Sequence, residues 1–283
     1  MLLNVLGKRA DNFHELETVL QPLPLCDELE LERGGKGIQL TCSEPALPAD
    51  SSNLVHRAAA AFLERARINE GVSIHLEKRI PLAAGLGGGS ANAAHTLVGL
   101  NALFGQPLSA SQLNGIAAAL GSDIPFFLQD KPALATGRGE RIAPLEPFPA
   151  LRGLCVFLVY PGFGISTAWA YQALAKYPEA LNGRPGRAQN LVALLQKGDL
   201  NAAAGELHNS LEAPALAKYP LLALFQEFLR THGAMAALMS GSGSTTFGLV
   251  NGQAAAERLR EEFNAKFGEN FWTAIVPVPG TEP

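Results

Sequence analysis

The stretch "PLAAGLGGGSANAAH" at residues 81–95 restricts the fold of this chain more than any other feature. Four of the five residues 85–89 are glycine, and an alanine-rich segment typical of a helix follows directly. Glycine loses more backbone entropy on folding than any other residue, so this cluster indicates a tight curl or a close approach to bare backbone. Before it, Val72, Ile74 and Leu76 alternate with polar residues, as in a strand. The sequence therefore predicts a strand, a glycine loop and a helix, in that order.

Two interpretations of the glycine loop follow from its residues. Successive glycines let backbone N–H groups converge on an anion, and a helix starting near Ser90 adds the positive end of its dipole. Ser90 would either cap that helix or place its hydroxyl on a phosphate or on Mg²⁺. A Walker A loop is excluded because no lysine follows the glycines. A dinucleotide fingerprint is excluded because Ser90 stands where it needs its third glycine. The protein-kinase pattern is excluded because no V-A-I-K strand follows. We predict a phosphate cradle, and a flexible strand-to-helix turn is the alternative.

Composition excludes several classes of protein. A chain of 283 residues with 47% apolar and 17% charged residues fits a soluble globular protein of one or two domains. The net charge of −4 predicts no attraction to nucleic acid or to anionic membranes, and no apolar run suggests a membrane span or signal peptide. Cys26, Cys42 and Cys155 lack C-x-x-C spacing, so neither disulfides nor a metal site is expected. We expect a cytoplasmic protein.

The remaining patterns mix strands and helices without regular alternation, which favours the α+β class. Residues 27–33 and 37–42 alternate apolar and polar residues around glycines and predict a β-hairpin. Asn53 is expected to cap a helix over 54–67, and further helices are expected after the glycine loop and over 109–120. Residues 154–161, 234–239 and 245–250 are strand-like, with mostly helical patterns up to about 231. The proline-rich stretch 140–153 predicts a junction, giving domains 1–150 and 151–283.

Three further motifs contain candidate functional residues. In "GSDIPFF" (121–127), Asp123 is the sole carboxylate of an apolar turn, either catalytic or bonded to its own backbone. "MSGSGSTTF" (239–247) is a small-residue turn that either passes close to a phosphate or only reverses the chain. In "GKRADNFHELET" (7–18), Phe13 and His14 would bind a base by stacking and edge hydrogen bonds, or Phe13 would pack in the core.

Together, "PLAAGLGGGSANAA", "GSDIPFF" and "MSGSGSTTF", in this order, resemble the GHMP kinase superfamily. The variant G-L-G-G-G-S followed by Ala/Ser-Asn-Ala-Ala is similar to the 4-diphosphocytidyl-2-C-methyl-D-erythritol kinases, whereas homoserine, mevalonate and galactose kinases usually carry G-L-G-S-S. "GKRADNFHELETVLQ" is similar to that family's G-x-R-x-D-G-Tyr-His-x-Leu-x-T, and "DSSNLVHRAA" to its D-N-L-v-x-R-A. The resemblance covers nearly the whole chain.

The resemblance implies a two-domain GHMP kinase fold. Its N-terminal domain would be like domain 2 of ribosomal protein S5, its C-terminal domain ferredoxin-like, with the active site in the cleft between. It implies transfer of the γ-phosphoryl group of ATP, with Mg²⁺, to the 2-hydroxyl of 4-diphosphocytidyl-2-C-methyl-D-erythritol. This step belongs to the non-mevalonate route to isopentenyl diphosphate. The partner is thus a small molecule, with no nucleic acid or membrane, and the expected enzyme is a monomer or weak homodimer.

The resemblance also assigns residues. Asp123 becomes the catalytic carboxylate that orients or deprotonates the substrate hydroxyl. The main chain of 86–91 becomes the phosphate cradle, within an ATP site made of Pro81, Leu82, Ala83, Ala84, Gly85, Leu86, Gly87, Gly88, Gly89, Ser90 and Ala91. Phe13 and His14 become a cytidine clamp, and the other substrate-site residues are Thr167, Gly241, Ser242, Gly243 and Ser244. No residue is assigned to a metal.

Three positions depart from the family pattern. Asn12 replaces a glycine and Phe13 a tyrosine; asparagine tolerates a left-handed backbone and phenylalanine still offers a π face. Relatives carry a catalytic lysine in Pro-Ala-Lys-x-Asn-Leu, which would stand before Met1. The alternatives to the expected kinase are therefore another GHMP small-molecule kinase and a catalytically silent nucleotide-binding protein of this fold.

Overall fold

The computed structural model describes residues 1–279, which form two compact units. The first unit contains residues 1–25, 83–86 and those from 131 onward, and the second contains residues 26–82 and 87–130. The first 25 residues join the C-terminal part because their strands pair in one sheet with a strand that begins at Ala133. This grouping differs from the division at residue 150 expected for the family domains, which stays a prediction.

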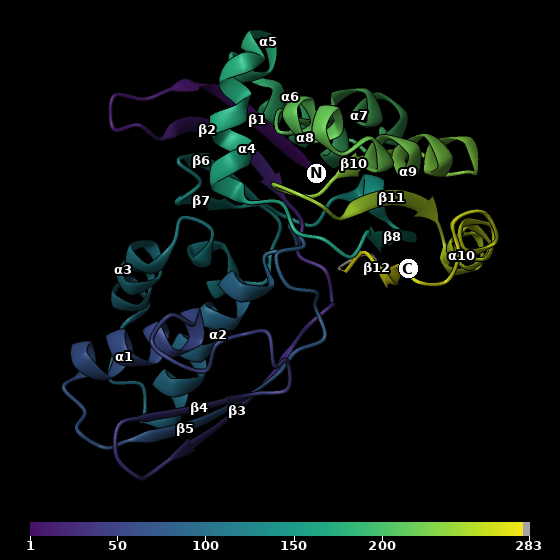
Figure 1. Ribbon diagram of the computed structural model, residues 1–283. Helices are drawn as coiled ribbons and strands as arrows, with labels where there is room; N and C mark the ends of the chain where they lie inside the picture. Colours follow the sequence, from purple (N-terminus) through teal and green to yellow (C-terminus); the bar gives the residue numbers. More distant parts are fainter. Residues whose placement is uncertain (280–283) are drawn as a thin grey trace. The chain divides into compact units, whose positions relative to one another are not determined.

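The second unit combines one sheet and three α-helices with a short 3-10 helix (Figure 1). Its elements are β3 (Glu28–Arg33), β4 (Ile38–Cys42), α1 (Leu54–Ala66), β5 (Val72–Glu77), α2 (Gly88–Leu103), α3 (Ala110–Leu120) and the 3-10 helix η1 (Ile124–Leu128).

The first unit contains two larger sheets. Its strands are β1 (Leu2–Lys8), β2 (His14–Leu20), β6 (Ala133–Gly137), β7 (Arg141–Pro144), β8 (Leu154–Tyr160), β9 (His208–Asn209), β10 (Ala236–Met239), β11 (Thr246–Asn251) and β12 (Trp272–Pro277). Its helices are α4 (Thr167–Ala173), α5 (Pro178–Leu181), α6 (Arg187–Gln196), α7 (Leu200–Glu206), α8 (Glu212–Lys218), α9 (Pro220–Thr231) and α10 (Gln253–Phe267), with 3-10 helices η2 (Pro149–Leu151) and η3 (Leu174–Lys176). This mixture confirms the α+β class.

The hairpin predicted for residues 27–42 is wrong, although both of its strands exist. In the sheet order β3-β5-β4, β5 lies between them, antiparallel to β3 and parallel to β4. Parallel neighbours need a crossover connection, and α1 supplies it between β4 and β5. The alternating pattern predicted both strands correctly but not the strand with which they pair. That strand is the central β5, whose apolar residues Val72, Ile74 and Leu76 are all buried.

The predicted helices of the second unit are confirmed, and their caps explain their limits. Asn53 Oδ1 accepts the Val55 N–H at 2.9 Å, and Ser109 with Gln112 forms a capping box at the start of α3. Buried residues of α1 and α2, such as Phe62 and Leu97, pack with the apolar side of β5 in one core. Figure 1 shows these helices on one side of the sheet.

In the first unit, β8 is the central apolar strand. It lies between β11 and β12 in the sheet order β10-β11-β8-β12, and alternate side chains point to opposite faces. Phe157 packs in one core with Phe225 of α9 and Phe263 of α10. Leu158 on the other face packs in the core that contains Leu191 of α6. A five-stranded sheet of order β7-β6-β2-β1-β9 completes this unit.

No helix within residues 1–279 is both long enough and apolar enough to cross a lipid bilayer.

Candidate active site

The first half of the glycine loop is held by the predicted turn at 239–247, within the first unit. The Thr245 N–H donates to the Ala84 carbonyl at 3.0 Å, and the Ser240 hydroxyl donates to the Gly85 carbonyl at 2.9 Å. Gly85 has a left-handed backbone with φ of 75°, and a Cβ atom there would lie 2.3 Å from the Ser240 carbonyl oxygen. Glycine is therefore required at residue 85 both for its φ and for the close approach of the turn.

The turn itself brings together the substrate-site residues that were predicted at 241–244 and Thr167. The Gly243 N–H donates to the Ser240 carbonyl at 2.9 Å, which closes the turn. The hydroxyls of Thr167, at the start of α4, and Ser242 lie 2.8 Å apart, and the Ser244 hydroxyl donates to the Phe163 carbonyl. Their contact with substrate stays a prediction.

Sequence reasoning missed the residues that connect this turn to the loop. Ser240 and Thr245 flank the predicted set and make the direct hydrogen bonds to Gly85 and Ala84. Both residues lie inside the motif "MSGSGSTTF", so the sequence could have indicated them as the two ends of the turn. Asn209, whose side chain donates to the carbonyls of Met239 and Gly241, carried no local signal because its partners are some thirty residues away.

The second half of the loop opens α2, within the second unit. Gly87 is the N-cap with φ of 71°, and a Cβ atom there would lie 2.5 Å from Cζ of Phe127. Ser90 is therefore in the first turn and does not cap the helix. The first N–H groups of a helix lack acceptors within it, and the first turn of α2 has no acidic residue. The start of α2 thus has neither a side-chain cap nor a negative charge, as the cradle interpretation requires.

A buried ion pair that the sequence analysis did not single out precedes the loop. Asp27 Oδ1 accepts the N–H groups of Arg79 and Ile80 at 2.7 and 2.8 Å, and Oδ2 accepts Lys78 Nζ. Burial acts to raise the pKa of the Asp27 carboxyl, but these hydrogen bonds and the Lys78 charge lower it below its usual value. Lys78 Nζ would lie 3.4 Å from a Cβ atom on Gly88. An ionised Asp27 thus fixes the main chain that enters the loop.

Asp123 lies between the end of α3 and η1, in the apolar turn predicted for it. Ile124 and Phe126 on its C-terminal side are buried, whereas Asp123 itself is exposed and makes no capping hydrogen bond. The interpretation of Asp123 as a turn residue bonded to its own backbone therefore has no support. Desolvation by neighbouring protein raises the pKa of its carboxyl. A carboxyl with a raised pKa on an exposed residue suits proton transfer.

Phe13 and His14 lie where β2 begins, after a turn in which Asn12 has the left-handed φ of 66°. The Phe13 side chain is 49% exposed, so its placement in the core is wrong. The Arg138 guanidinium carbon lies 4.6 Å from the centre of the Phe13 ring. The His14 ring stacks on Tyr171 with centroids 5.1 Å apart, and burial, with a smaller effect of the Lys8 charge, lowers the pKa of His14. A neutral imidazole offers one donor and one acceptor.

Known proteins match this chain over nearly its full length. The models for the GHMP kinases N terminal domain and the GHMP kinases C terminal match residues 53–131 and 191–269. A 4-diphosphocytidyl-2-C-methyl-D-erythritol kinase of Synechococcus sp. (strain JA-3-3Ab) is 43% identical, covering 98% of this chain and 91% of the relative. The two matched domains and the mixed sheets thus form a GHMP kinase fold.

Solved structures give the same relationship. A crystal structure of 4-(cytidine 5'-diphospho)-2C-methyl-D-erythritol kinase superposes with a TM-score of 0.76 and 34% identity, covering 97% of this chain and 95% of that chain. Homoserine kinase from Cytophaga hutchinsonii superposes with a TM-score of 0.68 over 93% of this chain and 86% of that chain, but its 22% identity shows the fold alone. The chain therefore belongs to the 4-diphosphocytidyl-2-C-methyl-D-erythritol kinase family of the GHMP kinases.

Proposed function

We propose that this chain transfers the γ-phosphoryl group of ATP to the 2-hydroxyl of 4-diphosphocytidyl-2-C-methyl-D-erythritol, a step of the non-mevalonate route to isopentenyl diphosphate. The observation that carries the proposal is the 43% identity, over almost both whole chains, to a kinase named for that substrate. The exposed Asp123 and the uncapped start of α2 support it, because phosphoryl transfer needs a group on the acceptor hydroxyl and donors on the phosphates.

In the proposed reaction, the 2-hydroxyl oxygen of the substrate attacks the γ-phosphorus, the bond from that phosphorus to the β–γ bridging oxygen breaks, and ADP leaves. Asp123 orients the hydroxyl and takes its proton. The backbone N–H groups of 86–91 receive the negative charge of the phosphates, and donors already fixed in place cost no reorganisation at the moment of reaction. Residues 81–85 complete the proposed ATP site on the entering chain.

Magnesium fits this site only as an ion that arrives with ATP. Within residues 1–279, no group of three or more His, Cys, Asp or Glu side chains is arranged to hold a metal ion. Mg²⁺ prefers oxygen ligands and often keeps waters and substrate phosphates around it, and the Ser90 hydroxyl is the group of this loop that would contact it. When bound, the ion neutralises charge on the phosphates. From the composition and the family resemblance, we further propose that the enzyme works in the cytoplasm as a monomer or weak homodimer.

The substrate class is tested by a coupled ADP-release assay with the full chain. We expect turnover with 4-diphosphocytidyl-2-C-methyl-D-erythritol that exceeds turnover with homoserine or mevalonate by on the order of a hundredfold or more in kcat/KM, a difference of about 2.7 kcal/mol. Preference for another alcohol would favour a different GHMP kinase. Binding of ATP without turnover of any of them would favour the silent nucleotide-binding protein.

Replacing Phe13 with alanine is expected to raise KM for the cytidine substrate by about ten- to a hundredfold, because stacking of a base on an aromatic ring contributes roughly 1–3 kcal/mol. KM for ATP should change little, and Phe13→Tyr, which keeps the ring, should behave like the parent enzyme. The measurement is steady-state kinetics with each substrate varied in turn. An equal rise for ATP and for the cytidine substrate would mean that Phe13 supports the fold and not the base.

A further inference from the structure

Asn209 lies between β1 and the turn at 240–245, and no catalytic or binding role has been assigned to it. It is buried, with 4% of its surface exposed, and belongs to the two-residue strand β9 at the edge of the five-stranded sheet. Its main chain pairs in parallel with Leu3 of β1, and the next residue, Ser210, reinforces this pairing. The Ser210 N–H donates to the Leu3 carbonyl at 2.8 Å, and the Ser210 hydroxyl accepts the Val5 N–H at 3.0 Å. The backbone of Asn209 is thus fixed to β1.

The side chain of Asn209 reaches to the turn that holds the glycine loop. Its Nδ2 donates to the Met239 carbonyl at 2.8 Å and to the Gly241 carbonyl at 2.7 Å. Its Oδ1 accepts the Leu211 N–H at 2.9 Å. Both protons of the amide nitrogen are used on carbonyl acceptors, so a carboxylate of the same shape could not replace it.

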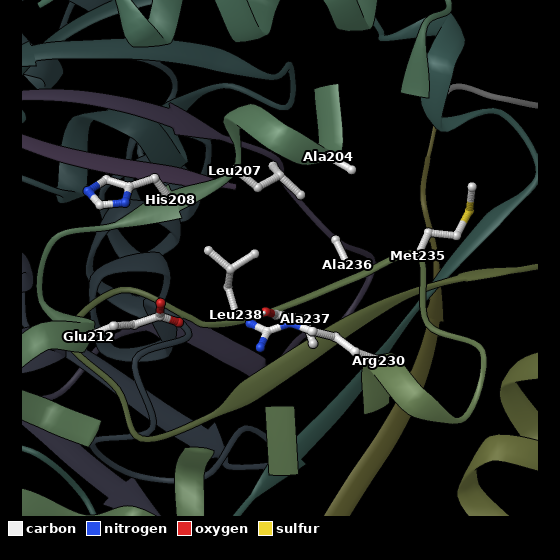
Figure 2. Close-up of a pocket in the computed structure, with 9 residues that line it drawn as sticks. All are labelled: Ala204, Leu207, His208, Glu212, Arg230, Met235, Ala236, Ala237 and Leu238. Carbon is white, nitrogen blue, oxygen red and sulfur yellow. Dashed lines mark hydrogen bonds between the residues drawn. The ribbon is translucent and has the colours of Figure 1, made fainter. Parts of the chain in front are cut away.

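The turn depends on such side chains because β10, which leads into it, is an edge strand. A cavity of about 230 Å³ lies along this edge. Glu212 and Arg230 are among the residues that line it (Figure 2). Glu212 Oε1 accepts the Met239 N–H at 2.6 Å, and Arg230 donates to the Ala237 carbonyl at 2.6 Å. Side chains therefore take the place of a neighbouring strand on this edge, and Asn209 is the one that extends past Met239 into the turn.

We propose that Asn209 is a positioning residue that fixes the turn at 240–245 relative to β1. Through Ser240 and Thr245 it would hold Ala84 and Gly85, and through β1 it is connected to β2, where Phe13 and His14 stand. One buried amide then sets the spacing between Ala84 and Gly85, which enter the proposed phosphate loop, and the proposed cytidine clamp. The kinetic part of this inference rests on the proposed function, whereas its structural part does not.

The test is Asn209→Asp, which keeps the shape and the acceptor for Leu211 but removes both donors. We expect hydrogen exchange of the backbone amides in 240–245 to accelerate about tenfold or more, because two carbonyls lose their donors and face a carboxylate. We also expect kcat to fall about tenfold or more, with KM for the cytidine substrate within about twofold, since the clamp on β2 is untouched. Asn209→Ser, which adds no charge, serves as a second variant if the first does not fold.

Asn101→Asp is the matched control. Asn101 is also buried and bonds one backbone residue in both directions, with Nδ2 on the Leu108 carbonyl at 3.1 Å and Oδ1 on the Leu108 N–H at 3.0 Å. The Asn101→Asp substitution should leave the hydrogen-exchange rates of the backbone amides in 240–245 unchanged. Unchanged exchange in folded Asn209 variants would overturn the inference, as would unchanged kcat in an active enzyme. If the unsubstituted chain turns over no cytidine substrate but exchange is faster in the Asn209 variants, the positioning role is supported and the proposed function is rejected.

Discussion

Replacing Asp123 with asparagine is expected to lower kcat by on the order of a hundredfold or more while leaving affinity for ATP within about twofold. The carboxylate is proposed to act on the acceptor hydroxyl, and general-base assistance contributes roughly a hundred- to ten-thousandfold. An amide of the same size accepts no proton, yet it disturbs little, because the Asp123 side chain makes no capping hydrogen bond. The measurement is the ADP-release assay combined with calorimetric titration of an ATP analogue.

The pH dependence gives the Asp123 prediction a second readout. Desolvation raises the pKa of Asp123 above its usual value, so the acidic limb of kcat/KM should rise with pH through an inflection above that of an ordinary aspartate. The amide introduced by Asp123→Asn has no group to titrate there, so the limb should disappear in that variant. Asp130→Asn is the control, since Asp130 is also exposed and follows the same 3-10 helix. An Asp123→Asn variant that keeps the parent kcat, or whose main defect is a lower affinity for ATP, would contradict the assignment.

Replacing Gly85 with alanine is expected to weaken binding of a non-hydrolysable ATP analogue by about a hundredfold. A left-handed backbone costs an alanine roughly 1–2 kcal/mol, and forcing an extra methyl into packed surroundings costs roughly 1–3 kcal/mol more. Here the added methyl meets the Ser240 carbonyl oxygen at 2.3 Å, which is backbone and cannot swing aside. The turn must separate from the loop, and the phosphate-binding amides lose their position.

Gly198→Ala isolates the cost of the left-handed backbone. Gly198 has φ of 81°, and a Cβ atom there meets nothing within 4 Å, so this variant carries the strain without the collision. The Gly198→Ala variant should lose stability without losing nucleotide affinity.

Gly88 has no positive φ, and a Cβ atom there would lie 3.1 Å from Cγ2 of Ile80. Substitution of Gly88 therefore tests packing against a side chain. Normal affinity in a folded Gly85→Ala variant would contradict the cradle.

Local features of the fold followed from the sequence because their causes are local. The cap at Asn53, the capping box at Ser109 and the alternation at Val72, Ile74 and Leu76 each depend on residues within one or two turns or along one strand. Asp123 could be singled out for the same reason, since it is the sole carboxylate of an apolar stretch. The order of three motifs then pointed to the family.

The structure decided what depends on partners far along the chain. The apolar pattern of β3 and β4 is the same whether they pair with each other or with β5, so only the tertiary structure placed β5 between them. The sequence was equally compatible with Phe13 packed in a core. In the structure Phe13 is exposed and follows the turn at Asn12.

The role of Asn209 is the clearest case in which the sequence alone was silent. Nothing around "LHNSL" indicates hydrogen bonds to Met239 and Gly241, because an amide is recognised only by the carbonyls that reach it. By itself the sequence determined which segments form elements and which short motifs bear chemistry, since sterics and periodicity act between near neighbours. The tertiary structure decided which backbone groups meet those motifs, because burial leaves distant polar groups no other partner.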